Sequence, residues 1–298
     1  MALANVSRVT VRRTAGPVGA EIEGVDLAAD LDEATFREIE ASYNANPVIV
    51  FRGQKLTPAQ QVRFSRCFGE LEIHVLKQYL LPGHPEILVI SNVTDDRGKL
   101  IGLADAGRVC VWHTDMSYLE KPSRGSTLYA IEVPHAPDGH PLGDTLFADT
   151  AMAYDALPAA TRARLRGLKA IHRMTKGYEV QKKKSESSVV YSNDQQRQNP
   201  DRSHPIVRTH PATGRKCIYL NRLVVVGIEG LPEAESGPLL EELYAHCTQP
   251  RFVYRHQWRV GDLVMWDNCM AQHLATIDYA LPQRRLMHRT TLSGTVPY

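Results

Sequence analysis

Short apolar runs rich in β-branched and aromatic residues recur along this chain, and they limit its fold more than any other feature of the sequence. Residues of these types favour a pleated, half-buried backbone, so the runs predict β-strands through the middle and the end of the chain. Helical segments do not alternate regularly with them, which disfavours a doubly wound parallel sheet and favours an antiparallel sandwich with flanking helices. The predicted strands are Val48–Phe51, Ile87–Ile90, Leu128–Val133, Ile218–Leu220, Phe252–Trp258 and Leu263–Trp266.

Helix and turn signals mark the connections between these strands. Thr57-Pro58-Ala59-Gln60 has the pattern of a capping box with proline at the first helical position, and it predicts a helix that ends near Gly69. The remaining predictions are a helix around Phe36 to Tyr43, a proline-interrupted helical pair over 151–168, a helix around Leu239 to Cys247 and a hairpin turn at Thr213-Gly214.

The charge and the cysteines limit the possible partners. With 35 Lys and Arg against 33 Asp and Glu, the net charge is only +2, so no global field draws the protein to nucleic acid or to a membrane. The five cysteines include no CxxC pair, and no stretch approaches the roughly 18 apolar residues of a membrane span. We expect reduced thiols, a cytoplasmic homo-oligomer and a small-molecule ligand.

One segment differs from the rest of an apparently single domain over residues 1–298. Residues 176–203 are polar, nearly free of periodicity and long for a connection between elements. Segments of this kind are often lids over a site. The sequence therefore predicts one domain with a mobile lid at 176–203.

The strongest chemical motif is Trp112-His113-Thr114-Asp115. In an extended chain, residues i and i+2 face the same side, so His113 and Asp115 can reach one metal ion, and His273 is a candidate third ligand. Two histidines and one carboxylate leave open positions on iron(II). Chance alone produces about 0.6 His-x-Asp pairs in a chain of this composition, so the pair needs further support. The rival His84-Pro85-Glu86 is expected in a surface turn.

Two further motifs supply that support, namely Gly143-Asp144-Thr145-Leu146-Phe147 and the segment from Gln283 to Thr290. Together with the His-x-Asp pair and His273, they closely resemble the taurine dioxygenase and 2,4-dichlorophenoxyacetate dioxygenase (TauD/TfdA) family of iron(II)/2-oxoglutarate enzymes. The resemblance covers nearly the whole chain, from residues 19–27 through 68–71 and 210–215 to the basic C-terminal segment.

The resemblance implies a double-stranded β-helix (jelly-roll) core and assigns roles to residues of this chain. His113, Asp115 and His273 would hold iron(II). Arg285 would grip the distal carboxylate of 2-oxoglutarate with two parallel hydrogen bonds, and Thr145 would donate to a co-substrate carboxylate. Arg284 adjoins Arg285, and a shift of one residue would exchange their roles. Turnover would consume O2 and 2-oxoglutarate and release succinate and carbon dioxide.

For the substrate, the resemblance points to His74 and Arg289 as partners of an anionic head group. Val109 stands where the taurine enzymes carry an asparagine, and Lys77 replaces an expected tyrosine, so the site is less suited to the amine of taurine. We therefore expect hydroxylation, next to a heteroatom, of an aryloxyalkanoate or of an alkanesulfonate or alkyl sulfate. The alternatives are a taurine dioxygenase proper, a zinc hydrolase, and a metal-binding jelly-roll protein without oxygenase activity.

Overall fold

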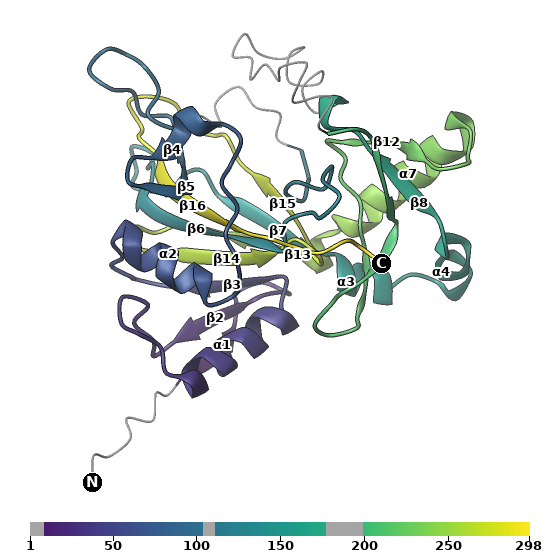
Figure 1. Cartoon of the computed structure of the whole chain (residues 1–298), viewed down its shortest axis with the longest axis horizontal. Helices are drawn as coiled ribbons and strands as arrows, with labels where there is room; N and C mark the ends of the chain where they lie inside the picture. Colours follow the sequence, from purple (N-terminus) through teal and green to yellow (C-terminus); the bar gives the residue numbers. More distant parts are fainter. Residues whose placement is uncertain (1–8, 104–110, 177–198) are drawn as a thin grey trace.

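The computed structural model describes residues 9–103, 111–176 and 199–298, and most of its regular structure is β-sheet (Figure 1). The largest sheet has eight strands. Neighbouring strands in it are antiparallel, except for the parallel pair of β2 and β3. In spatial order these strands are β1 (Thr10–Arg13), β2 (Ala20–Glu23), β3 (Val48–Phe51), β14 (Leu263–Asp267), β6 (Gly125–Glu132), β16 (Leu286–Leu292), β5 (His84–Ser91) and β4 (Leu80–Leu81).

A second, three-stranded antiparallel sheet forms the other side of the sandwich. It consists of β13 (Val253–His256), β7 (Thr145–Asp149) and β15 (Ala271–Ala275). Phe147 of β7 and Tyr254 of β13 pack in one buried cluster with Trp266 of β14 and Met287 of β16. The core therefore lies between the two sheets, and the predicted antiparallel sandwich is confirmed.

Two helices cover the outer face of the large sheet. They are α1 (Glu33–Ala45), which contacts β3 and β14, and α2 (Pro58–Arg66), which contacts β5 and β16. The capping box that starts α2 forms as predicted, because Thr57 accepts from the backbone of Gln60 while the Gln60 side chain accepts from the backbone of Thr57. Tyr43, Phe64 and Phe68 bury this helical layer against the sheet.

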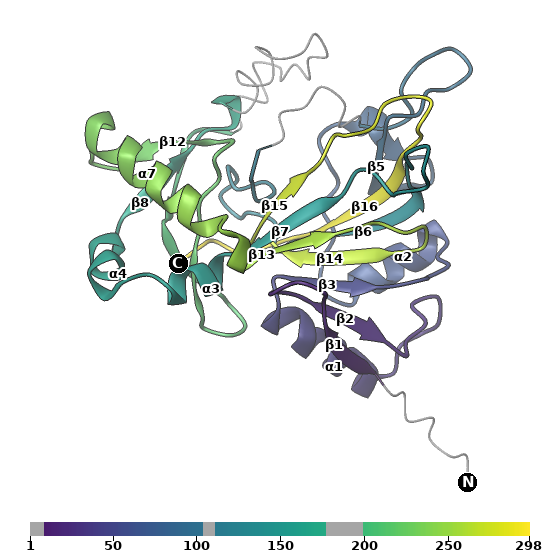
Figure 2. The same ribbon diagram turned by 180° about the vertical axis from the view of Figure 1, so that it is seen from behind.

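The remaining elements pack beside the sandwich, on the side opposite α1 and α2, as Figures 1 and 2 show. Their core joins α3, α7, β8 and β12 through residues such as Ala153, Ala170, Val225 and Leu243. The elements are α3 (Thr150–Asp155), α4 (Ala159–Leu165), α7 (Glu233–Cys247), the sheet of β12 (Val225–Ile228), β8 (Lys169–His172) and β9 (Arg202–Pro205), the pair β10 (Val207–Thr209) and β11 (Lys216–Ile218), and the short turn η2 (Pro250–Phe252). The other short turn, η1 (Lys77–Tyr79), lies against β5 of the large sheet.

Some predicted boundaries differ from the structure. His84-Pro85-Glu86, expected in a turn, begins β5, because the turn closes earlier at Gly83 (φ 81°) and Leu81 pairs with His84. The strand predicted from Phe252 starts one residue later, after the turn η2.

The predicted lid at 176–203 falls largely on residues 177–198, which lie outside the described residues, as does Val109. Its far end is a strand, since Arg202 and Ser203 belong to β9. In the described parts of the chain, no helix combines the length and the apolar character that crossing a membrane requires.

Candidate metal centre and substrate cavity

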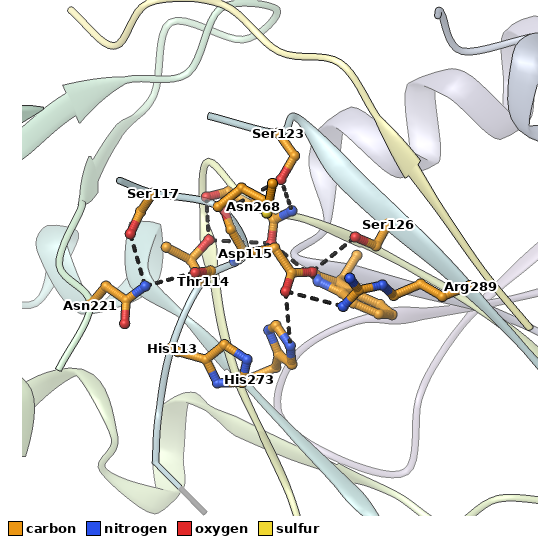
Figure 3. A network of polar contacts seen from close by, with 12 residues as sticks. His113, Thr114, Asp115, Ser117, Ser123, Ser126, Asn221, Asn268, His273 and Arg289 are labelled. Carbon is orange, nitrogen blue, oxygen red and sulfur yellow. Dashed lines mark hydrogen bonds and ion pairs between the residues drawn. The ribbon is translucent and has the colours of Figure 1, made fainter. Parts of the chain in front are cut away.

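His113, Asp115 and His273 meet at one place, and their ligand atoms all lie within 4.8 Å of one another (Figure 3). His273 belongs to β15, whereas His113 and Asp115 lie on the segment that enters from β5 toward β6. The two histidines are joined through the main chain. The amide of His113 donates to the carbonyl of His273 at 3.0 Å, and the amide of His273 donates to the carbonyl of His113 at 2.7 Å. This reciprocal pair fixes the backbones of both candidate ligands.

The ionisation states of the three residues suit a metal centre. Burial, together with nearby His113, lowers the pKa of His273 to about 3, so its imidazole is neutral near pH 7. Burial alone would raise the pKa of Asp115, but Arg289, the two histidines and the Ser126 hydroxyl outweigh it and hold that pKa well below its usual range. A neutral imidazole and an ionised carboxylate are the forms that bind a divalent cation.

Hydrogen bonds also fix the orientation of the candidate ligands. Nδ1 of His113 donates to the carbonyl of Val111 at 2.9 Å, which selects the tautomer whose Nε2 can bind metal. The Ser126 hydroxyl donates to Oδ2 of Asp115 at 2.9 Å. The donor set and its protonation therefore fit a two-histidine, one-carboxylate site for iron(II).

Asn268, in the turn that follows β14, holds the Asp115 segment through hydrogen bonds. Oδ1 of Asn268 accepts from the amide of Asp115 at 3.3 Å, from the Thr114 hydroxyl at 3.2 Å and from Trp266 Nε1 at 3.1 Å. The Asn268 side chain therefore holds the segment that carries Asp115 (Figure 3).

The two adjacent arginines have opposite surroundings. Arg285 is 2% exposed and lines the cavity beside the metal residues, together with Thr145, the first residue of β7. Arg284 is on the surface and pairs with Glu132 at 2.7 Å. The structure therefore brings Arg285 and Thr145 to the site and leaves Arg284 outside it.

Arg289 and His74 both line the cavity. The Arg289 guanidinium is 3.5 Å from Oδ1 of Asp115, and His74 lines the cavity while its Nδ1 accepts from the amide of Leu76. Lys77 is exposed in η1 and is not among the lining residues. The rest of the described lining is mainly apolar, and includes Ile90, Leu103, Leu128, Leu223, Val224 and Ile277.

Glu72 is a nearby acid to which the sequence assigned no role. Burial and the charge of Asp115 raise its pKa to about 7, although Arg289 opposes the shift. Its amide donates to the carbonyl of Thr291, two residues beyond Arg289 on β16. No pattern in the sequence pointed to Glu72, because only the folded chain brings it close to Arg289.

A second group of metal-binding residue types, His210, Asp267 and Cys269, is also buried among the described residues. Both imidazole nitrogens of His210 are occupied, since Nδ1 accepts from the amides of Ala212 and Thr213 and Nε2 lies 3.0 Å from Asp267. Burial and Asp267 raise the pKa of Cys269, which keeps it a thiol. This group is a structural network, not a second metal centre.

A β-sandwich that presents two histidines and one carboxylate at a cavity with a buried arginine defines a class, the mononuclear non-haem iron oxygenases. Residues 10–291 match the family model "Taurine catabolism dioxygenase TauD, TfdA family", and the chain belongs to this family. It is therefore an iron(II)- and 2-oxoglutarate-dependent dioxygenase with a jelly-roll core, as the sequence predicted.

Individual relatives agree with this assignment. The chain is 40% identical over 286 residues to an alpha-ketoglutarate-dependent 2,4-dichlorophenoxyacetate dioxygenase of Cupriavidus pinatubonensis, covering 93% of this chain and 95% of the relative. A taurine dioxygenase from Burkholderia xenovorans has a similar structure, with a TM-score of 0.79, 32% identity and coverage of 97% and 90%. AAD-2 in complex with Mn(II) and N-oxalylglycine gives a TM-score of 0.78 at 31% identity, covering 97% and 98%.

Proposed function

We propose that this dioxygenase hydroxylates a small organic anion with an apolar tail, with aryloxyalkanoates as the first substrate class. The observation that carries the proposal is the position of Arg289, whose guanidinium is 3.5 Å from Asp115 in a cavity that is otherwise mainly apolar. An anionic head held there has its neighbouring carbon beside the metal residues, and its tail against the apolar wall.

In this proposal His113, Asp115 and His273 hold the iron. Bound iron supplies the activation of O2, in which 2-oxoglutarate is converted to succinate and carbon dioxide and one oxygen atom is added to the substrate. Arg285 and Thr145 bind the co-substrate, because a buried planar guanidinium can donate two parallel hydrogen bonds to a carboxylate and the threonine hydroxyl can donate a third.

The same wall disfavours the amine of taurine. Leu223, Val224 and Ile277 offer it no side-chain hydrogen bond, and burying an ammonium without compensation is costly. The similarity to a 2,4-dichlorophenoxyacetate dioxygenase supports an aromatic tail. Hydroxylation of a carbon bonded to an ether oxygen gives a product that breaks into a phenol and a carbonyl acid.

The test is a screen for succinate release by the iron-loaded enzyme with aryloxyalkanoates, alkanesulfonates, alkyl sulfates and taurine. We expect higher kcat/KM for apolar-tailed anions than for taurine, since kcat/KM measures transition-state stabilisation. Arg289→Ala should lower it by about 10- to 100-fold, the equivalent of one charge-assisted hydrogen bond of roughly 1.5–3 kcal/mol. Taurine as the best substrate, or an unaffected Arg289→Ala variant, contradicts the substrate proposal.

A further inference from the structure

Asn221 lies between the wall of the cavity and the segment that carries two of the metal residues. It follows β11, is almost fully buried and lines the cavity itself. Its Nδ2 donates to the carbonyl of Thr114 at 2.7 Å and to the Ser117 hydroxyl at 2.8 Å, and its Oδ1 accepts from the amide of Leu223 at 3.0 Å (Figure 3). Both ends of the amide are therefore in use.

The segment that Asn221 holds has little regular structure of its own. After the main-chain pair at His113 the backbone turns through Met116, whose φ of 55° is a left-handed conformation that is unfavourable for a residue with a side chain. Thr114 stands between the two ligands, just before the turn, and Ser117 lies within the turn. A side chain that donates to both Thr114 and Ser117 therefore ties together the residues on the two sides of Met116.

Asn221 and Asn268 hold this segment through different groups. Asn268 binds the Thr114 hydroxyl and the Asp115 amide, whereas Asn221 binds the Thr114 carbonyl and the Ser117 side chain. Ser117 also lies 3.1 Å from Nδ1 of the buried His172 of β8. Asn221 thus links the loop between β11 and β12 to the segment of His113 and Asp115. This link is separate from the one that Asn268 makes from the turn after β14.

The other end of Asn221 reaches the substrate side. Its carbonyl accepts from the amide of Leu223, and the side chains of Leu223 and Val224 line the apolar wall where the proposed substrate tail lies. The side-chain amide of Asn221 therefore contacts both the wall, through Leu223, and the segment that places Asp115, through Thr114.

We propose that Asn221 is a positioning residue that sets the place of Asp115 in the metal centre and ties it to the wall that receives the substrate tail. The inference rests on the proposed function, since it takes His113, Asp115 and His273 as the metal ligands. When the Asn221 side-chain amide is removed, Asp115 is held less firmly in the metal centre. Conversion of 2-oxoglutarate to succinate then proceeds in part without hydroxylation of the substrate.

The experiment compares Asn221→Ala and Asn221→Asp with the wild-type chain, using Co(II) alone as the metal probe. Asn221→Asp keeps the shape but replaces the donor by an acceptor facing the Thr114 carbonyl. We expect both variants to bind Co(II) at least 10-fold more weakly and to change the visible spectrum of bound Co(II), which reports coordination geometry. With iron(II), they should release more succinate per hydroxylated product.

Two controls separate positioning from folding. Asn46→Asp makes the same change at the end of α1, where the amide donates to the carbonyl of Ser42, and should leave the Co(II) spectrum unchanged. Ser117→Ala removes one acceptor of Asn221 and leaves the Thr114 bond, so it should give a smaller shift of the same kind. If Asn221→Ala does not fold, an unchanged Co(II) spectrum in Ser117→Ala overturns the proposal.

The outcomes distinguish this inference from the proposed function. Folded Asn221 variants with the wild-type Co(II) affinity, spectrum and ratio of succinate to product overturn the role of Asn221. A lowered melting temperature with no spectral change likewise assigns Asn221 a purely structural role. A wild-type chain that binds no Co(II) and releases no succinate overturns the metal centre itself.

Discussion

Arg285 is held in place by aromatic side chains, and its planar group is the basis of a prediction about the co-substrate. Its guanidinium carbon lies 5.8 Å from the ring centre of Tyr279 and 6.0 Å from that of Trp258. Arg285→Lys keeps the charge but loses the two-pronged geometry, so we expect KM for 2-oxoglutarate to rise by about 10-fold or more. Succinate formation at varied 2-oxoglutarate measures the change.

Arg284→Lys is the matched control for this prediction. Its side chain pairs with Glu132 on the surface, so KM for 2-oxoglutarate should stay at the wild-type value. The assignment of Arg285 is contradicted if the Arg284 variant shows the larger change, or if neither variant shows any.

Glu72 is the basis of a prediction about how binding at the proposed substrate site depends on pH. Its pKa is about 7, raised mainly by burial, so the carboxyl is neutral below that pH and becomes a negative charge near Arg289 above it. That charge competes with an anionic substrate for the arginine. We expect KM for the substrate to rise as the pH rises from 6 to 8, and Glu72→Gln to remove most of the rise. An equal rise in both proteins would exclude Glu72 as its source.

At the scale of elements, local signals predicted local structure well. The capping box of α2 involves only Thr57 and Gln60, and the hairpin turn between β10 and β11 needs only Thr213 and Gly214, so both could be inferred from short stretches. The order of the strands could not be, because β14 lies between β3 and β6 through hydrogen bonds to residues distant in the chain.

The same distinction applies to the site. His113, Asp115 and His273 were singled out by their motifs, and the structure brings them together. Asn221 and Ser126 carry no motif, and each acts on a residue from another segment. Their positions follow only from the tertiary fold. Asp115 itself lies in a turn and not on the end of a strand, because Met116 reverses the backbone immediately after it.

For the whole molecule, buried histidines predict how stability changes with pH. Burial lowers the pKa of His172 and His273 to about 3 and that of His288 to about 4, so the unfolded chain binds more protons than the folded one between those values and about 6.5. Stability therefore falls as the pH falls through this window. The raised pKa of Glu72 has the opposite effect on stability, but it is one group against three histidines.

The measurement is urea unfolding of the metal-free protein between pH 7.5 and 4.5. Each such histidine contributes up to about 1.4 kcal/mol of unfolding free energy per pH unit. We expect a decrease on acidification that is larger than one group can produce. A free energy of unfolding that stays constant or increases as the pH is lowered would contradict the assignment of neutral buried imidazoles.

The reciprocal main-chain hydrogen bonds between His113 and His273 have a consequence for redesign of the enzyme. Every residue except proline carries the same backbone donor and acceptor, so exchanges elsewhere in the cavity leave this link between the two histidines in place. The side chains of Leu223, Val224 and Ile277 line the wall, and the hydrogen bond from Leu223 to Asn221 uses the main-chain amide, which exchange for any residue but proline retains. Libraries that vary these three positions should therefore yield variants with new substrate ranges whose affinity for the metal is retained.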